Sequence, residues 1–193
     1  MANFLQVLEI IFMLVDQSLV TIYYVDESGF SLQAYIPYGY QPKGVQWSFP
    51  SVRKKVSNVL SFLNPFTNHL VTFQLPKGQS MNSEFFIRYM NEFAAKLTEK
   101  TILILDNASW HKSKATQAMY ETWEEQGLYL LFLPPRCPHL NKIETLWRKI
   151  KYEWLSICDY HSEKTLKRKL NHIFQTYGLN YCIKFSMNLF DSK

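Results

Sequence analysis

The stretch Leu133-Pro-Pro-Arg-Cys-Pro-His-Leu-Asn-Lys-Ile-Glu-Thr-Leu-Trp-Arg-Lys-Ile-Lys151 decides how this chain is organised. It follows an apolar run, residues 128–133, that is typical of a buried strand. Its prolines end that strand, because proline lacks the N–H group that a sheet ladder needs. From Asn141 onward, apolar residues recur at helical spacing and predict one buried stripe. The members of this stripe are Ile143, Leu146, Trp147, Ile150 and Trp154.

Glu144 lies in the first turn of this predicted helix. Arg148 and Lys151 follow on the same side of the helix. Two interpretations of Glu144 stay open. Its spacing from Asn141 fits a capping box, in which the glutamate only closes the helix N-terminus. The alternative is an acid held there for chemistry, and the rest of the chain favours this second interpretation.

Two aspartates stand in matched settings elsewhere in the chain. The runs Val20-Thr-Ile-Tyr-Tyr-Val-Asp26 and Thr101-Ile-Leu-Ile-Leu-Asp106 both predict apolar strands that end in an acid. Alternation along a strand puts Asp26 on one face with Ile22 and Tyr24, and Asp106 on one face with Ile102 and Ile104. An acid beside apolar residues is costly unless it is paired or bound to a metal. A turn-forming aspartate at a strand end is the ordinary alternative.

Three segments of the chain together resemble a known family. They are Val25-Asp-Glu-Ser-Gly-Phe-Ser-Leu32, Leu105-Asp-Asn-Ala-Ser-Trp-His-Lys-Ser113 and the stretch from Leu133 to Trp147. They are similar to the three blocks of the DDE transposases, in particular the mariner superfamily and its bacterial insertion-sequence branch. The sequence separation of Asp106 and Glu144 is in keeping with the bacterial branch, and the resemblance covers residues 20–154.

The element pattern agrees with the fold that this resemblance implies. Predicted strands at 19–26, 56–63 and 70–75 favour antiparallel pairing, and the run 31–35, after a turn at Gly29, could form a further short strand. Helices at 83–97 and 114–126 then alternate with the strands at 101–106 and 128–133, which predicts parallel pairing with right-handed crossovers. The prediction is a ribonuclease-H-like α/β fold: a mixed five-stranded sheet, three antiparallel strands followed by two parallel ones, flanked by helices.

The resemblance implies a metal-dependent site made of Asp26, Asp106 and Glu144. Three ionised acids brought together repel one another unless a cation neutralises them, and oxygen-only ligands select Mg²⁺ or Mn²⁺. We expect two Mg²⁺ ions, for which Mn²⁺ substitutes, with Asp26 bridging both, Asp106 on one and Glu144 on the other. Asn107 and His111 are expected to support the site, although His111 could equally be a polar loop histidine.

The expected partner is DNA. The net charge of +5 and the pI of about 9.0 suit a polyanion without proving one. Candidate phosphate contacts are Lys43, Arg53, Lys112, Arg148 and Lys151. Lys43 belongs to an aromatic and basic loop, residues 37–44, that is suited to gripping a nucleic-acid backbone. The family resemblance implies cleavage at transposon ends, strand transfer to target DNA at TA dinucleotides, and a homodimer assembled on DNA.

The chain reads as one domain with two short additions. We expect an N-terminal helix packed on the domain (1–18), a catalytic core (19–156) and a C-terminal helical extension (157–193) with a helix over 162–177. The apolar N-terminus is too short to span a membrane and lacks a basic leader, so we expect a cytoplasmic protein, nucleoid-associated if bacterial. Cys137, Cys158 and Cys182 show neither zinc spacing nor a disulfide framework.

The chain departs from the family pattern in two ways. The segment before the first strand has no room for the helix-turn-helix domains that usually recognise transposon ends, so we expect a companion polypeptide or a truncated product. Arg136 and Cys137 replace the usual Tyr-Ser, and Lys142 replaces the usual proline. Two other functions stay open: a metal-dependent nuclease without strand transfer, and a catalytically silent nucleic-acid-binding module.

Overall fold

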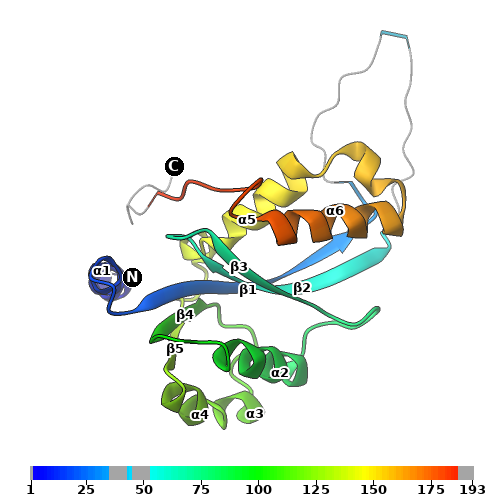
Figure 1. The fold of residues 1–193 in the computed structure, drawn as a ribbon. Coiled ribbons are helices and arrows are strands. Elements are labelled where there is room, and N and C mark those ends of the chain that lie inside the picture. The colour runs from blue at the N-terminus through cyan, green and yellow to red at the C-terminus, as the bar shows by residue number, and fades with distance from the viewer. Residues whose placement is uncertain (1, 35–42, 45–52, 187–193) are drawn as a thin grey trace.

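The computed structural model of the chain describes residues 2–34, 43–44 and 53–186. Its strands form one mixed sheet in the order β3-β2-β1-β4-β5, with helices on both faces (Figure 1). The strands are β1 (Thr21–Ser31), β2 (Lys55–Asn64), β3 (His69–Gln74), β4 (Thr101–Leu105) and β5 (Leu128–Phe132). The helices are α1 (Ala2–Asp16), α2 (Ser83–Ala94), α3 (Lys114–Gln117), α4 (Tyr120–Glu125), α5 (Ile143–Lys149) and α6 (Glu163–Thr176).

The strand pairing confirms the predicted mixed sheet. β1 pairs antiparallel with β2, and β2 pairs antiparallel with β3. β4 lies parallel to β1 on its other side, and β5 lies parallel to β4. In the parallel pair, Tyr24 stands opposite Ile104. Asp26 and Asp106 each follow two residues later, so the register alone brings the two aspartates to neighbouring positions.

Two hydrophobic cores hold the layers together, one on each face of the sheet. Helices α5 and α6 cover one face, and α2, α3 and α4 cover the other (Figure 1). Alternation along β1 sends Ile22 and Tyr24 into the core beneath α5 and α6, and Tyr23 and Val25 into the opposite core. Asp26 therefore points to the α5 face, as its strand position predicts. Helix α1 packs on the same core through Leu8, which is buried.

The predicted turn at Gly29 is wrong, because β1 continues through this glycine to Ser31. Gly29 stands opposite Asn58 of β2, and a Cβ atom at Gly29 would come within 3.0 Å of the Asn58 Oδ1 atom. The glycine thus permits a close approach of neighbouring strands, not a reversal of the chain. Residues 32–34 of the predicted strand 31–35 form no strand, and Tyr35 lies outside the described residues.

Two further boundaries differ from the prediction. The helix expected over 114–126 is two short helices, α3 and α4, separated at Ala118 and Met119. Beyond α5, the chain makes one turn of π-helix, Ile150–Trp154, before the bend that leads to α6. Helices α2 and α6 each begin after a polar cap, since Asn82 and Ser162 accept hydrogen bonds from backbone N–H groups of their first turns.

Within the described part of the chain, no helix has the length and apolar character needed to cross a membrane. The three cysteines, all of which are described, form no disulfide. Of the expected DNA-contacting loop 37–44, only Lys43 and Gly44 are described, so that interpretation falls outside the described residues.

Candidate active site

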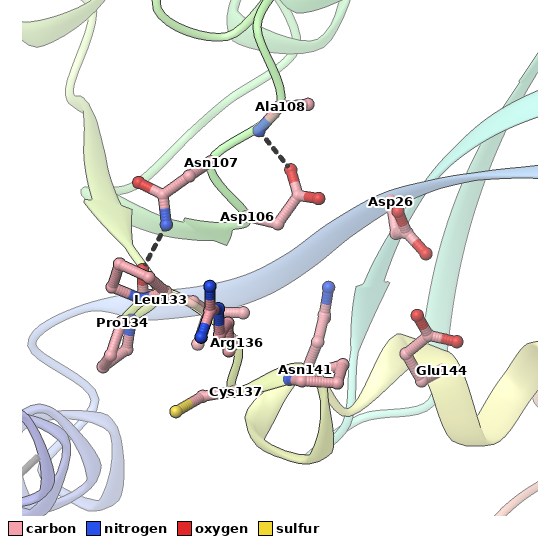
Figure 2. Close-up of a pocket in the computed structure, with 12 residues that line it drawn as sticks. Asp26, Asp106, Asn107, Ala108, Leu133, Pro134, Arg136, Cys137, Asn141 and Glu144 are labelled. Carbon is pink, nitrogen blue, oxygen red and sulfur yellow. Dashed lines mark hydrogen bonds between the residues drawn. The ribbon is translucent and has the colours of Figure 1, made fainter.

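A cavity of about 390 Å³ lies where β1, the end of β4 and the start of α5 meet (Figure 2). The three acids singled out in the sequence, Asp26, Asp106 and Glu144, all line this cavity. Other lining residues come from the segment after β4 and from the proline-rich crossing before α5, and they include Asn107, Arg136, Cys137 and Asn141. The fold therefore brings together the three segments that the sequence pattern linked.

Asp26 reaches the cavity from the middle of β1, where it is partly buried. The indole N–H of Trp147 donates a hydrogen bond of 3.0 Å to its Oδ2 atom. Burial, and after it the negative charge of Glu144, raise the pKa of Asp26 to about 7. Hydrogen bonds from the Glu27 backbone and from Trp147 oppose this rise in pKa. Burial therefore outweighs the hydrogen bonds that favour the ionised form of Asp26.

Asp106 follows β4 directly and is held by its own loop. Its Oδ1 atom accepts a hydrogen bond from the backbone N–H of Ala108 at 3.0 Å and lies 3.0 Å from Nδ1 of His111. His111 is buried, and its Nδ1 atom also lies 3.1 Å from the Asp106 carbonyl oxygen. Because both neighbours of Nδ1 are acceptors, this nitrogen must carry a proton. The hydrogen bond from His111 is the main cause that lowers the pKa of Asp106.

Glu144 projects from the first turn of α5, and its carboxylate points toward that of Asp26 in Figure 2. The capping-box interpretation of this residue is wrong. Helix α5 begins at Ile143, its start has no side-chain cap, and Glu144 bonds to Asn141 only through its own backbone N–H and the Asn141 carbonyl oxygen. The side chain of Asn141 is buried against β1, so it is not available to cap the helix.

Asn107 and Lys112 brace the wall of the cavity beside Asp106. The amide nitrogen of Asn107 donates to the carbonyl oxygen of Leu133 at 2.5 Å, and its amide oxygen accepts from the Lys112 ammonium. Lys112 also lies 4.8 Å from the ring centroid of Phe132. These contacts fasten the segment after β4 to the end of β5, so both residues hold the position of Asp106.

The other candidate phosphate contacts lie in different places. Lys151 lies near the site: burial lowers its pKa, and the charges of Glu144 and Asp26 oppose that effect. Arg148 is exposed on α5. Lys43 and Arg53 are exposed too, and among the described residues neither lines the cavity.

The donor set of the cavity fits a hard divalent cation in its chemistry. All three acids offer oxygen, and burial, followed by the negative charge of Glu144, raises the pKa of Asp26, so a bound cation would favour its ionised form. Across residues 2–34, 43–44 and 53–186, however, no three Asp, Glu, His or Cys side chains already stand as a closed ligand cluster. The acids therefore share one cavity in an open arrangement.

Three features of this site do not follow from the sequence pattern. Helical spacing assigns Trp147 only to the buried stripe, yet it also donates to Asp26, and its place one turn after Glu144 is a usable signal. Arg136 lines the cavity with a left-handed backbone, φ 60°, which is uncommon for a residue with a side chain. Asn141 lines the cavity with a buried amide, which a capping pattern does not reveal.

Known proteins resemble this chain over most of its length. Residues 21–167 match the family described as DDE superfamily endonuclease. An uncharacterized protein, y4pE/y4sA, of Sinorhizobium fredii (strain NBRC 101917 / NGR234) is 38% identical over 55 residues, which are 28% of this chain and 36% of that protein.

Two solved structures share the fold. The Mos1 strand transfer complex is 16% identical with a TM-score of 0.59, over 87% of this chain and 51% of that chain. The Mos1 mariner paired end complex with Mn is 17% identical with a TM-score of 0.57, over 80% of this chain and 48% of that chain. This chain thus spans about half the length of the Mos1 chains, and the likeness confirms the predicted ribonuclease-H-like fold.

Proposed function

This chain belongs to the DDE superfamily endonucleases, and on that basis we propose that it is the catalytic domain of a mariner-type transposase that cuts DNA and transfers the freed strand. One observation carries the proposal: Asp26, Asp106 and Glu144 arrive from β1, the end of β4 and the start of α5 to line a single cavity. Three acids that converge from distant segments are hard to explain as structural groups, because their mutual repulsion destabilises the fold.

We propose that the three carboxylates hold two Mg²⁺ ions, or Mn²⁺ in their place, with Asp26 shared between the ions. When bound, such ions activate an attacking oxygen and stabilise the leaving oxygen of a phosphodiester. Metal dependence is supported by the oxygen-only donor set and by the raised pKa of Asp26. It is also supported by the Mos1 paired end complex, whose structure was solved with Mn.

The chain's own residues set the positions of these acids. Trp147 fixes one oxygen of Asp26 through its indole N–H, while Ala108 and His111 fix one oxygen of Asp106. No hydrogen bond from a described residue holds the side chain of Glu144, which is exposed on α5, so it can turn toward an incoming ligand. The carboxylates of Asp26 and Asp106 are therefore oriented before substrate binds.

The substrate we propose is DNA. Arg136 lines the cavity, Arg148 lies on α5 one turn after Glu144, and Lys151 lies in the π-helical turn that follows α5, so these cations can receive phosphates that flank the reacting one. Lys43, Arg53 and Lys112 are further candidate phosphate contacts. From the family resemblance we also propose transposon ends and a TA target as substrates, a homodimer on DNA, and a companion polypeptide with helix-turn-helix domains for end recognition.

The test uses wild-type protein and the Asp106→Asn variant. Duplexes from the DNA that flanks the coding region, with a 3′-hydroxyl already exposed, are incubated with supercoiled plasmid and either Mg²⁺ or Mn²⁺. We expect wild type to join the duplex to the plasmid only with metal present, and the variant to lose joining while keeping its fold. Metal-dependent nicking without joining would favour a nuclease, and no reaction by a folded wild-type protein would favour a silent binding module.

A further inference from the structure

Asn141 carries a buried oxygen that has no hydrogen-bond partner in the part of the chain that the structure describes. The residue lies just before α5, is 4% exposed, and lines the same cavity as the three acids. Its Oδ1 atom accepts no hydrogen bond from any described residue. Its Nδ2 atom donates to the carbonyl oxygen of Val25 at 3.5 Å, a long contact with the residue before Asp26. Glu144 follows Asn141 by one helical turn.

The orientation of this amide follows from its neighbour on β1. If the amide were reversed, its oxygen would face the Val25 carbonyl oxygen, and two acceptors would repel. The nitrogen therefore faces the strand, and the oxygen must be the group left for another partner. Figure 2 shows the Asn141 side chain rising between the proline-rich crossing and the pair Asp26 and Glu144.

A second buried asparagine, Asn64, has the hydrogen-bond partners that the Asn141 oxygen lacks. Asn64 is 5% exposed, and its Oδ1 atom accepts hydrogen bonds from the backbone N–H groups of Phe66 and Thr67. An acceptor buried without a hydrogen-bond partner lowers the stability of the fold. In folded proteins such a group ordinarily has a functional role or binds a water molecule or an ion. Asn141, unlike Asn64, is one of the residues that line the acid-bearing cavity, and this links its unpaired oxygen to what the cavity binds.

We infer that the Asn141 Oδ1 atom is a fourth oxygen of the divalent-cation site, receiving the hydrated cation that Asp26, Asp106 and Glu144 attract. This inference rests on the proposed function, because it assumes that the cavity binds a cation. An amide carbonyl oxygen is a normal ligand or hydrogen-bond acceptor for hydrated hard cations. It adds an oxygen without adding negative charge, which suits a cavity where three carboxylates already repel one another.

The experiment measures Mn²⁺ binding by calorimetry and melting with and without Mn²⁺ by circular dichroism. It compares wild type, Asn141→Leu, Asn141→Asp and the matched control Asn64→Leu. Leucine has the same branched shape and the same number of side-chain heavy atoms as asparagine but no acceptor, whereas aspartate keeps an oxygen at this position and adds charge. None of these readouts requires catalytic activity.

We expect Asn141→Leu to bind Mn²⁺ about tenfold more weakly, within the range for residues that surround a metal site. Without Mn²⁺ it should melt at or above the wild-type temperature, because it buries no unpaired oxygen. Asn141→Asp should melt lower than wild type without Mn²⁺ and show a larger rise in melting temperature on adding it. Asn64→Leu should melt lower with unchanged Mn²⁺ affinity, since two backbone N–H groups lose their acceptor.

Other results overturn the inference in ways that can be told apart. Unchanged Mn²⁺ affinity in Asn141→Leu, with a lower melting temperature, would mean that Asn141 holds only a structural water, and the proposed function would stand. If Asn141→Leu does not fold, a Mn²⁺-induced rise in Asn141→Asp no larger than in wild type overturns the inference equally. Absence of Mn²⁺ binding by folded wild type would remove both the inference and the metal-dependent function.

Discussion

Asp26 on β1 and Asp106, directly after the neighbouring parallel strand β4, occupy matched positions. Their surroundings nevertheless shift the pKa values of the two carboxyl groups in opposite directions. Asp26 is partly buried beneath α5, faces Glu144, and has a pKa raised to about 7. Asp106 is half exposed, contacts His111, and has a lowered pKa. The two residues have the same side chain and line the same cavity. The elements packed over each strand end therefore decide how each acid behaves.

Because the two aspartates differ in this way, one cavity is both preformed and responsive to a ligand. The contact with His111 keeps Asp106 ionised and aimed before any ligand arrives. Asp26, in contrast, holds its proton up to near-neutral pH and releases it more readily when a cation supplies positive charge. One acid provides a fixed anchor, and the other couples metal binding to proton release.

The first prediction concerns strand joining and asks whether both aspartates serve one reaction despite their different pKa values. Asp26→Asn and Asp106→Asn should each reduce strand joining by roughly a thousandfold or more, the scale seen when a main electrostatic group leaves an active site. Each substitution removes negative charge that holds the same cation. Joining assays under saturating Mn²⁺, on protein of verified fold, provide the measurement. Substantial joining by either variant would show that its acid stands outside the reaction.

The second prediction concerns the free energy of unfolding without metal, which the ionised form of Asp26 should lower. Its pKa in the folded protein, about 7, lies above the ordinary value of 3.8. The folded state therefore binds the proton more tightly, so wild-type stability falls as pH rises from about 4 to about 7 and stays low above that. Asp26→Asn removes this loss and should be more stable than wild type by roughly 2–4 kcal/mol at pH 8.

Urea unfolding at pH 5 and pH 8 in the presence of a chelator measures this difference directly. The stability advantage of Asp26→Asn should be smaller at pH 5, where wild type has lost only part of this stability, than at pH 8. Adding Mn²⁺ at pH 8 should narrow the gap, because the cation stabilises only the protein that keeps the carboxylate. An Asp26→Asn variant that gains nothing between pH 5 and pH 8 would show that Asp26 titrates normally.

Local sequence pattern predicted most of the fold and the three acids. Apolar runs that end in Asp26 and Asp106 are local signals, and so is the helical stripe that follows the prolines. Alternation along a strand then fixed the face of each aspartate. The register of β1 and β4 agrees with this prediction, since it places the two aspartates at neighbouring positions.

The errors occurred where the role of a residue depends on a partner far away in the sequence. Gly29 reads as a turn residue until Asn58 is known to approach it across the sheet. Asn141 has the spacing of a cap, but burial against Val25 turns its side chain away from the helix end. The bond from Trp147 to Asp26 joins residues on different elements, so helical periodicity alone could only report that the indole is buried.

The third prediction isolates the contribution of α5 to Asp26. Trp147→Phe keeps an aromatic ring but removes the N–H group that donates to the Asp26 carboxylate. The pKa of Asp26 should rise further, and Mn²⁺ affinity at pH 7 should fall about tenfold, as for other groups that orient a metal ligand. The loss should shrink at pH 9, where Asp26 is ionised in both proteins. Calorimetric titrations at the two pH values provide the measurement.

Trp123→Phe is the matched control for this prediction. Trp123 is also buried, and its indole N–H donates to the Asn91 side chain at 2.7 Å on the opposite face of the sheet. Its substitution should lower stability by about 1 kcal/mol or more without changing the affinity for Mn²⁺. Equal effects of the two substitutions on Mn²⁺ binding would assign Trp147 a packing role only.

The last prediction concerns the effect of Asp106→Asn on the free energy of unfolding, which should be small. The pKa of Asp106 is lowered, so its ionised form stabilises the folded state above its ordinary pKa, and this stability is lost as pH falls through the lowered value. Because the side chain is 53% exposed, solvent screens the contact with His111. Asp106→Asn should therefore cost less than about 1 kcal/mol at pH 7, measured by urea unfolding in a chelator.

The deficit of Asp106→Asn should persist from pH 8 down to pH 5 and shrink below about pH 4, where wild type also begins to lose the charge. At pH 8, Asp26→Asn and Asp106→Asn remove the same charge from the same cavity, yet they should shift the free energy of unfolding in opposite directions. Shifts of equal sign would mean that general repulsion among the acids governs the site. Opposite signs would show that α5 and the His111 loop, each acting on its own aspartate, set the electrostatics.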